Sequence, residues 1–457
     1  MKFHIALAFD QPVPHRSIEP RASGKTTVTE SEKKTHNTEF SNTWWDKFIT
    51  QTDSLNQPAV IKNAISQDRV ESYKQSVMGI LSQLGKLKTT QFGYRVYVEG
   101  RQLDFEEMED FFERAPHDAE TLEQWTDRVF GGKKFGIILN SGEKFDLKLT
   151  SEIAICLSPF FEKIGYPRGG AQFTIFVGNY DKTPLGIHQD KRGESVMHFH
   201  LGPAGKTMYV WDPKQYRDLL ATHGLTKKNF NELRPYAKEY QFESGDIYYM
   251  PEGTYHIGQQ DDLSIGITIW RYNHTDDHLA KHLHQRIIKQ IPVEATDDFQ
   301  YDTTPLDDTS GIDHIVEKYQ VADEYKQLSY SELLRKTYQD WRYCVHSNAG
   351  YRNAPFPRED RVNLALQDWI QIEKPYNILL RESIATEKMY IYVRGHKIEF
   401  RYFSCLIPFI AKINDGEILR VDALLNLLDA SWSPNIGIYI LSELHRCHGI
   451  RIVDAAA

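Results

Sequence analysis

Apolar residues recur with two different periods along this chain, and the changes of period divide it into parts. Residues 11–40 are polar and nearly free of periodic apolar positions, which predicts a flexible N-terminal arm over residues 1–40. From residue 41 onward, helical and strand-like spacing alternate, with helices predicted at 104–115, 119–130 and 149–165 and strands at 58–64, 94–100 and 171–180. Strands then dominate as far as Tyr272, so we expect a mixed α and β domain over residues 41–274.

Helical spacing of apolar residues returns after Tyr272, and the last part of the chain then combines strand-like and helical segments. Residues 275–385 contain three amphipathic segments and are predicted to form a connecting helical region. Residues 386–457 read as a hairpin at 389–403, three short helices and a final strand at 450–453. This order predicts a winged-helix-like domain. The histidines of "HRCHG", residues 445–449, have no second cluster at zinc spacing and are expected to be polar residues at a helix end.

Composition and charge narrow the class of protein. The 457 residues exceed what one core supports, so two or three domains are expected, and 40% hydrophobic and 26% charged residues are ordinary for a globular protein. No apolar run approaches the length of a membrane helix, and the N-terminal apolar stretch is short and interrupted by Asp10. The four cysteines lie far apart, without a Cys-x-x-Cys pair. We therefore expect a cytoplasmic protein without a membrane segment.

The net charge of −9 disfavours a general nucleic-acid binder, because such proteins usually carry a basic surplus. The predicted winged-helix-like part has eight Lys and Arg residues against eight Asp and Glu residues, so it has no such surplus either. A protein or peptide is the better expected partner.

The stretch "GDIYYMPEGTYHIGQ", residues 245–259, is similar to the second conserved motif of the cupin superfamily, with Gln260 in place of the usual Asn. Pro251 and Gly253 favour a tight turn between two strands, and the second strand would direct His256 into a barrel mouth. The resemblance implies a double-stranded β-helix, the jelly-roll fold of cupins and JmjC proteins, with flanking helices.

An earlier segment supplies partners for His256. His188 and Asp190 are two residues apart, so a strand would project both side chains from one face. Two histidines and one carboxylate form the facial triad of non-haem Fe(II) oxygenases, which leaves three adjacent coordination positions open. Rival ligands are His198 and His200, a second pair with this spacing, and Glu194. The alternative for these histidines is an ordinary polar position on the barrel wall.

A co-substrate such as 2-oxoglutarate would need a buried cation for its far carboxylate. Lys206 begins the strand after the "GPAG" turn and is the candidate. Together, "TPLGIHQD", "GKTMYVWDP" and "GDIYYMPEGTYHIG" resemble the JmjC-type Fe(II)/2-oxoglutarate oxygenases, among them the ribosomal oxygenases and the asparaginyl hydroxylase of hypoxia-inducible factor. The resemblance covers about residues 45–272.

This resemblance implies roles for particular residues. It implies that His188, Asp190 and His256 bind iron and that Lys206 holds 2-oxoglutarate, although the family's gap before this cation is usually a few residues shorter. It also implies co-substrate contacts from the hydroxyls of Thr183 and Tyr180. Arg271, fifteen residues after His256, is the alternative cation. The domain order matches the ribosomal oxygenases, which implies dimerisation through the helical region.

The sequence thus predicts an enzyme that uses Fe(II), 2-oxoglutarate and O₂ to hydroxylate a C–H bond, with release of succinate and CO₂. Asp190 favours hydroxylation over halogenation, because a halogenase of this class typically has Gly or Ala there. The substrate implied by the resemblance is a side chain of a protein or peptide, and a demethylase outcome begins with the same chemistry. Two alternatives are a metal cupin acting on a small molecule without 2-oxoglutarate, and a non-catalytic peptide-binding protein.

Overall fold

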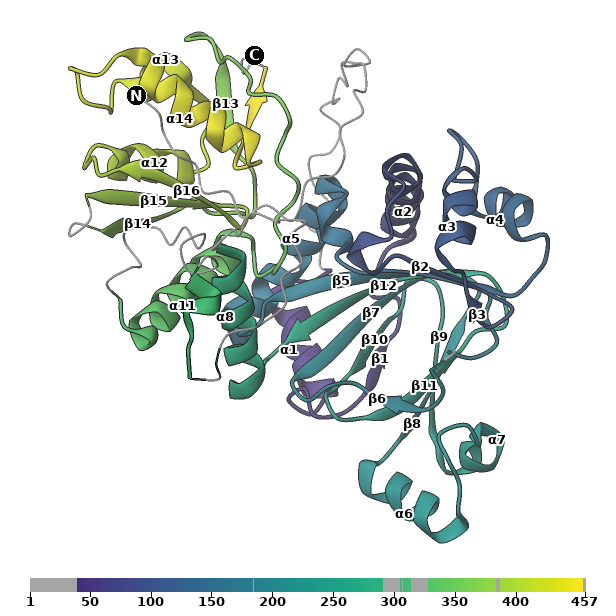
Figure 1. The fold of residues 1–457 in the computed structure, drawn as a ribbon. Coiled ribbons are helices and arrows are strands. Elements are labelled where there is room, and N and C mark those ends of the chain that lie inside the picture. Colours follow the sequence, from purple (N-terminus) through teal and green to yellow (C-terminus); the bar gives the residue numbers. More distant parts are fainter. Residues whose placement is uncertain are drawn as a thin grey trace.

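Two antiparallel β-sheets face each other at the centre of the molecule (Figure 1). The computed structural model describes residues 39–183, 185–290, 305, 307–313, 328–383 and 387–454. The larger sheet has eight strands in the order β1 (Ala59–Ile61), β10 (Ile247–Met250), β7 (Glu194–Pro203), β12 (Ser264–Tyr272), β5 (Ala171–Gly178), β4 (Phe135–Leu139), β2 (Arg95–Val98) and β3 (Arg101–Gln102). The smaller sheet has the order β6 (His188–Gln189), β11 (Tyr255–Gln259), β8 (Lys206–Trp211) and β9 (Lys238–Phe242).

The chain crosses repeatedly between these sheets. Strands β5, β7, β10 and β12 belong to the larger sheet, and β6, β8, β9 and β11, which lie between them in sequence, belong to the smaller one. All pairings among these eight strands are antiparallel. This topology is consistent with the predicted double-stranded β-helix.

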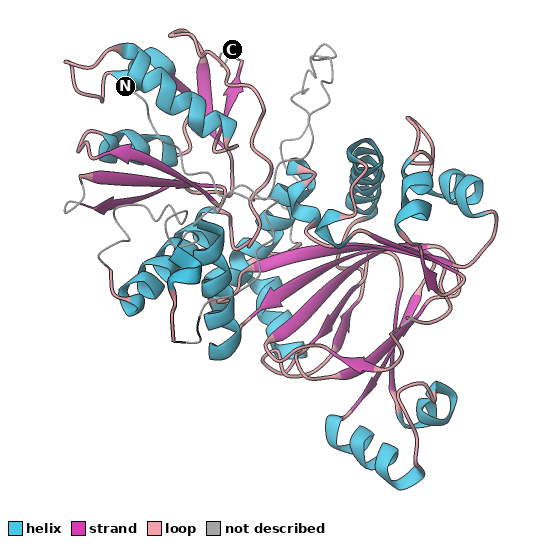
Figure 2. Ribbon diagram, in the orientation of Figure 1, coloured by secondary structure: helices cyan, strands magenta, loops and turns pink. Residues whose placement is uncertain are grey.

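Helices cover the outer face of the larger sheet (Figure 2). They are α1 (Asn42–Gln51), α2 (Gln67–Leu87), α3 (Phe105–Phe112), α4 (Leu122–Phe130) and α5 (Leu147–Ile164), with short 3₁₀ turns at Gln91–Gly93 and Gly142–Lys144. Strand β12 shows how the two faces differ: Ile265, Ile267 and Ile269 pack into the core beneath the helices, whereas Thr268 and Trp270 line an internal cavity. The opposite directions follow from the two-residue period of a strand.

Side-chain caps mark the starts of the predicted helices. Asp104 and Thr121 form capping boxes at α3 and α4, and the Asp146 carboxylate accepts the backbone N–H of Leu149 at α5. No predicted element corresponds to α2. The predicted arm lies outside the described residues except for Glu39 and Phe40, and the Phe40 ring is buried 4.8 Å from that of Trp44.

The connection from β8 to β9 forms α6 (Pro213–His223), α7 (Phe230–Leu233) and a 3₁₀ turn at Arg234–Tyr236. The predicted helical region contains α8 (Asp276–Gln290) and α11 (Tyr330–Ser347), which pack through Leu279, Leu283, Trp341 and Val345. A 3₁₀ turn lies at Ser310–Ile312, but the predicted helix at 313–328 falls almost entirely outside the described residues. Among the described helices, none has the length and apolar character needed to cross a bilayer. Dimerisation through this region stays a prediction.

The C-terminal part has its own core between two small sheets. One sheet has the order β17 (Leu419–Arg420), β13 (Trp369–Ile372) and β18 (Ile450–Val453), and the other β14 (Leu379–Ser383), β15 (Lys388–Val393) and β16 (His396–Arg401). The predicted hairpin and three helices are present, the helices being α12 (Leu406–Asn414), α13 (Val421–Leu425) and α14 (Pro434–Arg446). The predicted boundary at residue 386 separates β14 from its partner β15. The winged-helix fold itself stays a prediction.

Buried histidines should make this part sensitive to acid. His448 is 6% exposed, its Nε2 lies 2.8 Å from the carbonyl oxygen of Phe356, and burial, with the charge of Arg358, lowers its pKa to about 4. Because the folded state binds this proton less readily than the unfolded chain, the free energy of unfolding should fall as pH drops from about 6.5 to about 4.

We expect His448→Gln, whose amide can still donate to Phe356, to lose about 2 kcal/mol less stability than the native protein between pH 7 and pH 4.5. Urea unfolding at the two pH values measures this difference. Identical losses in both proteins would contradict the assignment to His448.

Candidate metal centre and co-substrate cavity

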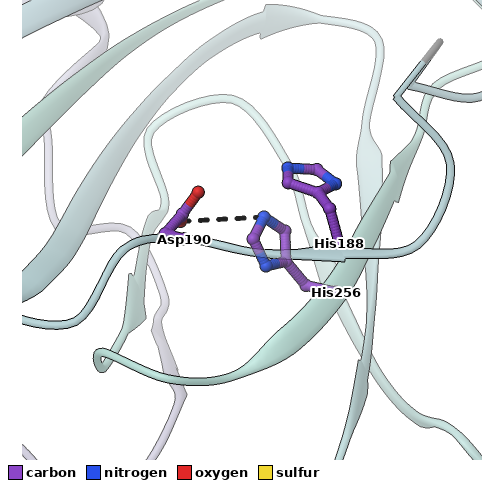
Figure 3. Close-up of side chains that lie close together, drawn as sticks. All are labelled: His188, Asp190 and His256. Carbon is purple, nitrogen blue, oxygen red and sulfur yellow. Dashed lines mark ion pairs between the residues drawn. The ribbon is translucent and has the colours of Figure 1, made fainter.

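Two neighbouring strands of the smaller sheet bring three side chains to one point (Figure 3). Strands β6 and β11 pair so that His256 lies opposite His188, with ring centroids 4.3 Å apart. Asp190 follows β6, and its Oδ2 lies 3.8 Å from the Nε2 of His256. One potential ligand atom from each residue lies within 4.8 Å of the other two. Among the described residues, no other histidine, cysteine or carboxylate group forms such a cluster.

Backbone carbonyls orient both histidines. The Nδ1 of His188 lies 2.9 Å from the oxygen of Gly186, and the Nδ1 of His256 lies 3.1 Å from the oxygen of Thr254. A carbonyl oxygen only accepts hydrogen bonds, so each Nδ1 carries the proton and each Nε2 keeps a lone pair. A histidine held in this way is ready to bind a metal through Nε2.

The pKa values of these three residues are those expected of side chains that bind a cation. Burial lowers the pKa of His256 to about 3, with a further lowering from His188, and burial also lowers the pKa of His188 itself. Burial raises the pKa of Asp190 to about 7, and the charge of Glu194 adds to this shift. The Oδ2 atom of Asp190 is buried without a hydrogen-bond partner. Two neutral imidazoles and an unpartnered carboxylate fit a divalent transition-metal ion.

The rival ligands have other partners. His198 has its Nδ1 2.7 Å from the hydroxyl of Thr268, and its Nε2 lies 3.4 Å from the Nδ1 of His200. His200 in turn contacts the carbonyl oxygen of Ala204. These two histidines are polar positions on the barrel wall. Glu194 lies on β7 outside the cluster, and burial raises the pKa of its carboxyl group.

A cavity of about 530 Å³ lies beside the three residues and reaches between the two sheets. Its lining includes the whole triad and three of the residues predicted to hold the co-substrate, namely Lys206, Tyr180 and Thr183. The structure therefore brings six of the seven candidate residues to one space.

Lys206 is the buried cation of this cavity. It begins β8 and is 8% exposed, and its Nζ donates to the Tyr180 hydroxyl across 3.0 Å. Its ammonium lies 5.6 Å from the centre of the Phe176 ring. Within the described part of the chain, no carboxylate lies within ion-pair distance of Lys206. Such a cation can bind a carboxylate through charge-assisted hydrogen bonds.

Three glycines that were not predicted as site residues leave space for the side chains of Tyr180, Lys206 and Thr183. A Cβ on Gly136 or Gly178 would stand 3.1 or 3.0 Å from the Tyr180 ring. A Cβ on Gly258 would stand 3.1 Å from the Cε of Lys206 and 3.3 Å from the Oγ1 of Thr183. Gly258 could have been found from the sequence, because it is two residues after His256 and shares its face of β11.

Arg271, the alternative cation, lies elsewhere. It is on β12, two residues beyond the core residue Ile269, and its guanidinium stands 5.1 Å from the ring centre of Phe160 on α5. It is absent from the cavity lining. Arg271 therefore faces the helical layer, and Lys206 is the cation that the structure places beside the triad.

No protein-family model and no curated protein matches the sequence. Among solved structures, the chain is similar to YcfD, a ribosomal oxygenase from Escherichia coli, with 14% identity over 87% of this chain and 95% of that chain and a TM-score of 0.43. A structure of YcfD with cobalt and 2-oxoglutarate has 15% identity, the same coverage and a TM-score of 0.42. SnoK, a non-heme α-ketoglutarate-dependent carbocyclase from nogalamycin biosynthesis, has 11% identity over 61% of this chain and 98% of its own, with a TM-score of 0.31.

Proposed function

We propose that this protein is an Fe(II)- and 2-oxoglutarate-dependent oxygenase that hydroxylates a C–H bond. The observation that carries the proposal is the position of an uncompensated buried lysine in the same cavity as an unpartnered buried His-Asp-His cluster. When bound, Fe(II), 2-oxoglutarate and O₂ supply oxidative decarboxylation to succinate and CO₂ together with hydroxylation of the substrate.

Different residues would bind the metal and the co-substrate. The Nε2 atoms of His188 and His256 and the carboxylate of Asp190 would hold the metal on one side, which leaves adjacent positions open toward the cavity. Lys206 would bind the far carboxylate of 2-oxoglutarate, and its hydrogen bond to Tyr180 directs the ammonium. The Thr183 hydroxyl lies at the same end and donates to the carbonyl oxygen of Gly258 across 3.2 Å, so it would contact the carboxylate by giving up this hydrogen bond.

The cavity also favours this reading over a cupin that works without 2-oxoglutarate. Such an enzyme has no need of a buried cation, whereas here Lys206 lines the cavity and its charge is not neutralised by a described carboxylate. Keeping an unpaired ammonium away from water is costly unless an anion binds it. We propose further that the substrate is a side chain of a protein or peptide, which rests on the sequence resemblance.

Succinate formation from 2-oxoglutarate with Fe(II) under air tests the proposal. The native protein is expected to turn over 2-oxoglutarate slowly without substrate, and His188→Ala should reduce the rate by at least about 100-fold because one metal ligand is lost. Lys206→Ala should weaken 2-oxoglutarate binding by roughly 30-fold, equivalent to about 2 kcal/mol for a charge-assisted contact.

The matched control is Lys47→Ala, which removes an exposed lysine on α1 and should leave both quantities unchanged. Absence of succinate from the native protein, together with no binding of 2-oxoglutarate to the metal-loaded protein, would refute the proposal. That result would favour a metal cupin acting on a small molecule or a non-catalytic peptide-binding protein.

A further inference from the structure

A chain of hydrogen bonds runs from the cavity wall to the turn between β7 and β8. It begins at the hydroxyl of Thr268, 2.7 Å from the Nδ1 of His198, and continues over 3.4 Å from the Nε2 of His198 to the Nδ1 of His200. It ends where the Nε2 of His200 meets the carbonyl oxygen of Ala204 at 2.7 Å. The side chains of Thr268, His198 and His200 are all buried.

The far end of this chain sets the direction of every bond in it. The carbonyl of Ala204 can only accept, so the Nε2 of His200 carries a proton. Burial lowers the pKa of His200 to about 4 and that of His198 well below its ordinary value, so both rings are neutral and each carries one proton. The Nδ1 of His200 is then a lone pair, which accepts from the Nε2 of His198.

It follows that the Nδ1 of His198 also has a lone pair and accepts the hydroxyl proton of Thr268. The opposite tautomer of His198 would set two buried lone pairs against each other across 3.4 Å, which is unfavourable. Because its proton is used in this way, the oxygen of Thr268 presents only lone pairs to the cavity that it lines.

Thr174 provides a second hydrogen-bond acceptor beside Thr268. It lies directly across from Thr268 on β5, lines the same cavity, and donates its hydroxyl proton to the Oδ1 of Asn140 at 3.2 Å. Residues directly opposite each other on antiparallel strands have Cβ atoms about 5 Å apart. Two neighbouring oxygens on the cavity wall can therefore accept a hydrogen bond from whatever occupies the space, but cannot donate one.

The co-substrate has no hydrogen-bond donor to offer these two oxygens. Each polar atom of ionised 2-oxoglutarate is an acceptor, and the cavity offers it donors elsewhere: the ammonium of Lys206 and the hydroxyl of Tyr248, which is buried without a partner. A carboxylate placed against Thr268 would set acceptor against acceptor. The pair of threonines is thus available for the other ligand of the cavity, the substrate.

We propose that Thr268 and Thr174 form a specificity site that reads a nitrogen donor, such as a guanidinium, ammonium or amide N–H group, on the side chain presented for hydroxylation. This inference rests on the proposed function. A substrate that presents only acceptors or only apolar atoms to these threonines leaves buried lone pairs without a partner, which is a strong basis for rejection.

The tautomers can be tested directly and without a substrate. Long-range ¹H–¹⁵N correlation spectra of the full-length protein labelled at histidine report which ring nitrogen carries the proton, with His198→Gln and His200→Gln for assignment. We expect protonated Nε2 in both residues. A proton on the Nδ1 of His198 would free the hydroxyl proton of Thr268 and overturn the proposal.

The selectivity can be measured with alanine pentapeptides that carry arginine, glutamine, glutamate or norleucine at the centre. Calorimetry would follow their binding to the full-length protein loaded with Zn(II) and 2-oxoglutarate. The arginine and glutamine peptides are expected to bind at least about 10-fold more tightly than the other two, and Thr268→Ser should keep this preference. Thr268→Val, which keeps the shape but removes the acceptor, should reduce it to within about 3-fold.

Two results would overturn the inference: no preference for donor peptides in the native protein, or an unchanged preference in Thr268→Val. Failure of the proposed function is recognised separately, because the native protein would then form no succinate from 2-oxoglutarate. Succinate formation combined with no donor preference would refute the specificity site alone.

Discussion

Asp190→Ala is expected to reduce succinate formation by at least about 1,000-fold, because it removes the one anionic ligand of the proposed metal centre. The same change should make the metal-free protein more stable. The Oδ2 of Asp190 is buried without a hydrogen-bond partner, and burial raises the pKa of the carboxyl group to about 7. Since the folded-state pKa lies above the unfolded one, the cost of ionising this group is fully present above pH 7.

At pH 8 we therefore expect the free energy of unfolding of metal-free Asp190→Ala to exceed that of the native protein by about 2 kcal/mol. Added Fe(II) or Co(II) should stabilise the native protein and leave the variant unchanged. Thermal unfolding with and without metal measures both effects. Asp218→Ala, which removes an exposed carboxylate on α6, is the control. Turnover within about 10-fold of native in Asp190→Ala would contradict its role as a ligand.

Gly258→Val is expected to weaken 2-oxoglutarate binding by at least about 30-fold while leaving metal affinity within about 3-fold of native. A Cβ at this position already stands 3.1 Å from the Cε of Lys206 and 3.3 Å from the Oγ1 of Thr183, and the two methyl groups of valine would extend into the same space. The three proposed metal ligands are untouched. Valine is favoured in strands, so β11 should form normally.

A graded series sharpens this test. Gly258→Ala adds the Cβ alone and should give an intermediate loss, because the flexible end of Lys206 can shift by a few tenths of an ångström. Thr207→Val, which places a valine on the neighbouring strand β8 at a position outside the cavity lining, is the control. Titration of 2-oxoglutarate into the metal-loaded protein measures the affinity. Unchanged affinity in Gly258→Val would place the co-substrate away from Lys206.

Local pattern was sufficient for the main features of the site. The spacing of His188 and Asp190 directs both side chains to one side of an extended segment, of which β6 is the first part, and Pro251 and Gly253 set the turn before His256 through their own backbone preferences. The predominance of strands between β5 and β12 and most helices outside this stretch also follow from periodicity that is local to each segment, although α6 and α7 between β8 and β9 were not predicted.

The tertiary structure alone decided which polar residues were already satisfied. His198 has the same spacing to His200 as His188 has to Asp190, and only the positions of Thr268 and Ala204 on other segments reveal that both rings have partners. Arg271 shows a second limit. Both faces of β12 are buried, one by helices and one by the cavity wall, so hydrophobic alternation does not tell them apart.

The free space of the site also depends on the packing of distant segments. Gly136 and Gly178 lie on different strands, and their importance arises because the Tyr180 ring rests against both and reaches Lys206. The pairing of β14 with β15, which lie on either side of the predicted boundary at residue 386, likewise becomes visible only in the tertiary structure. Strand partners and cavities are set by contacts between segments far apart in sequence, and a one-dimensional pattern does not contain those contacts.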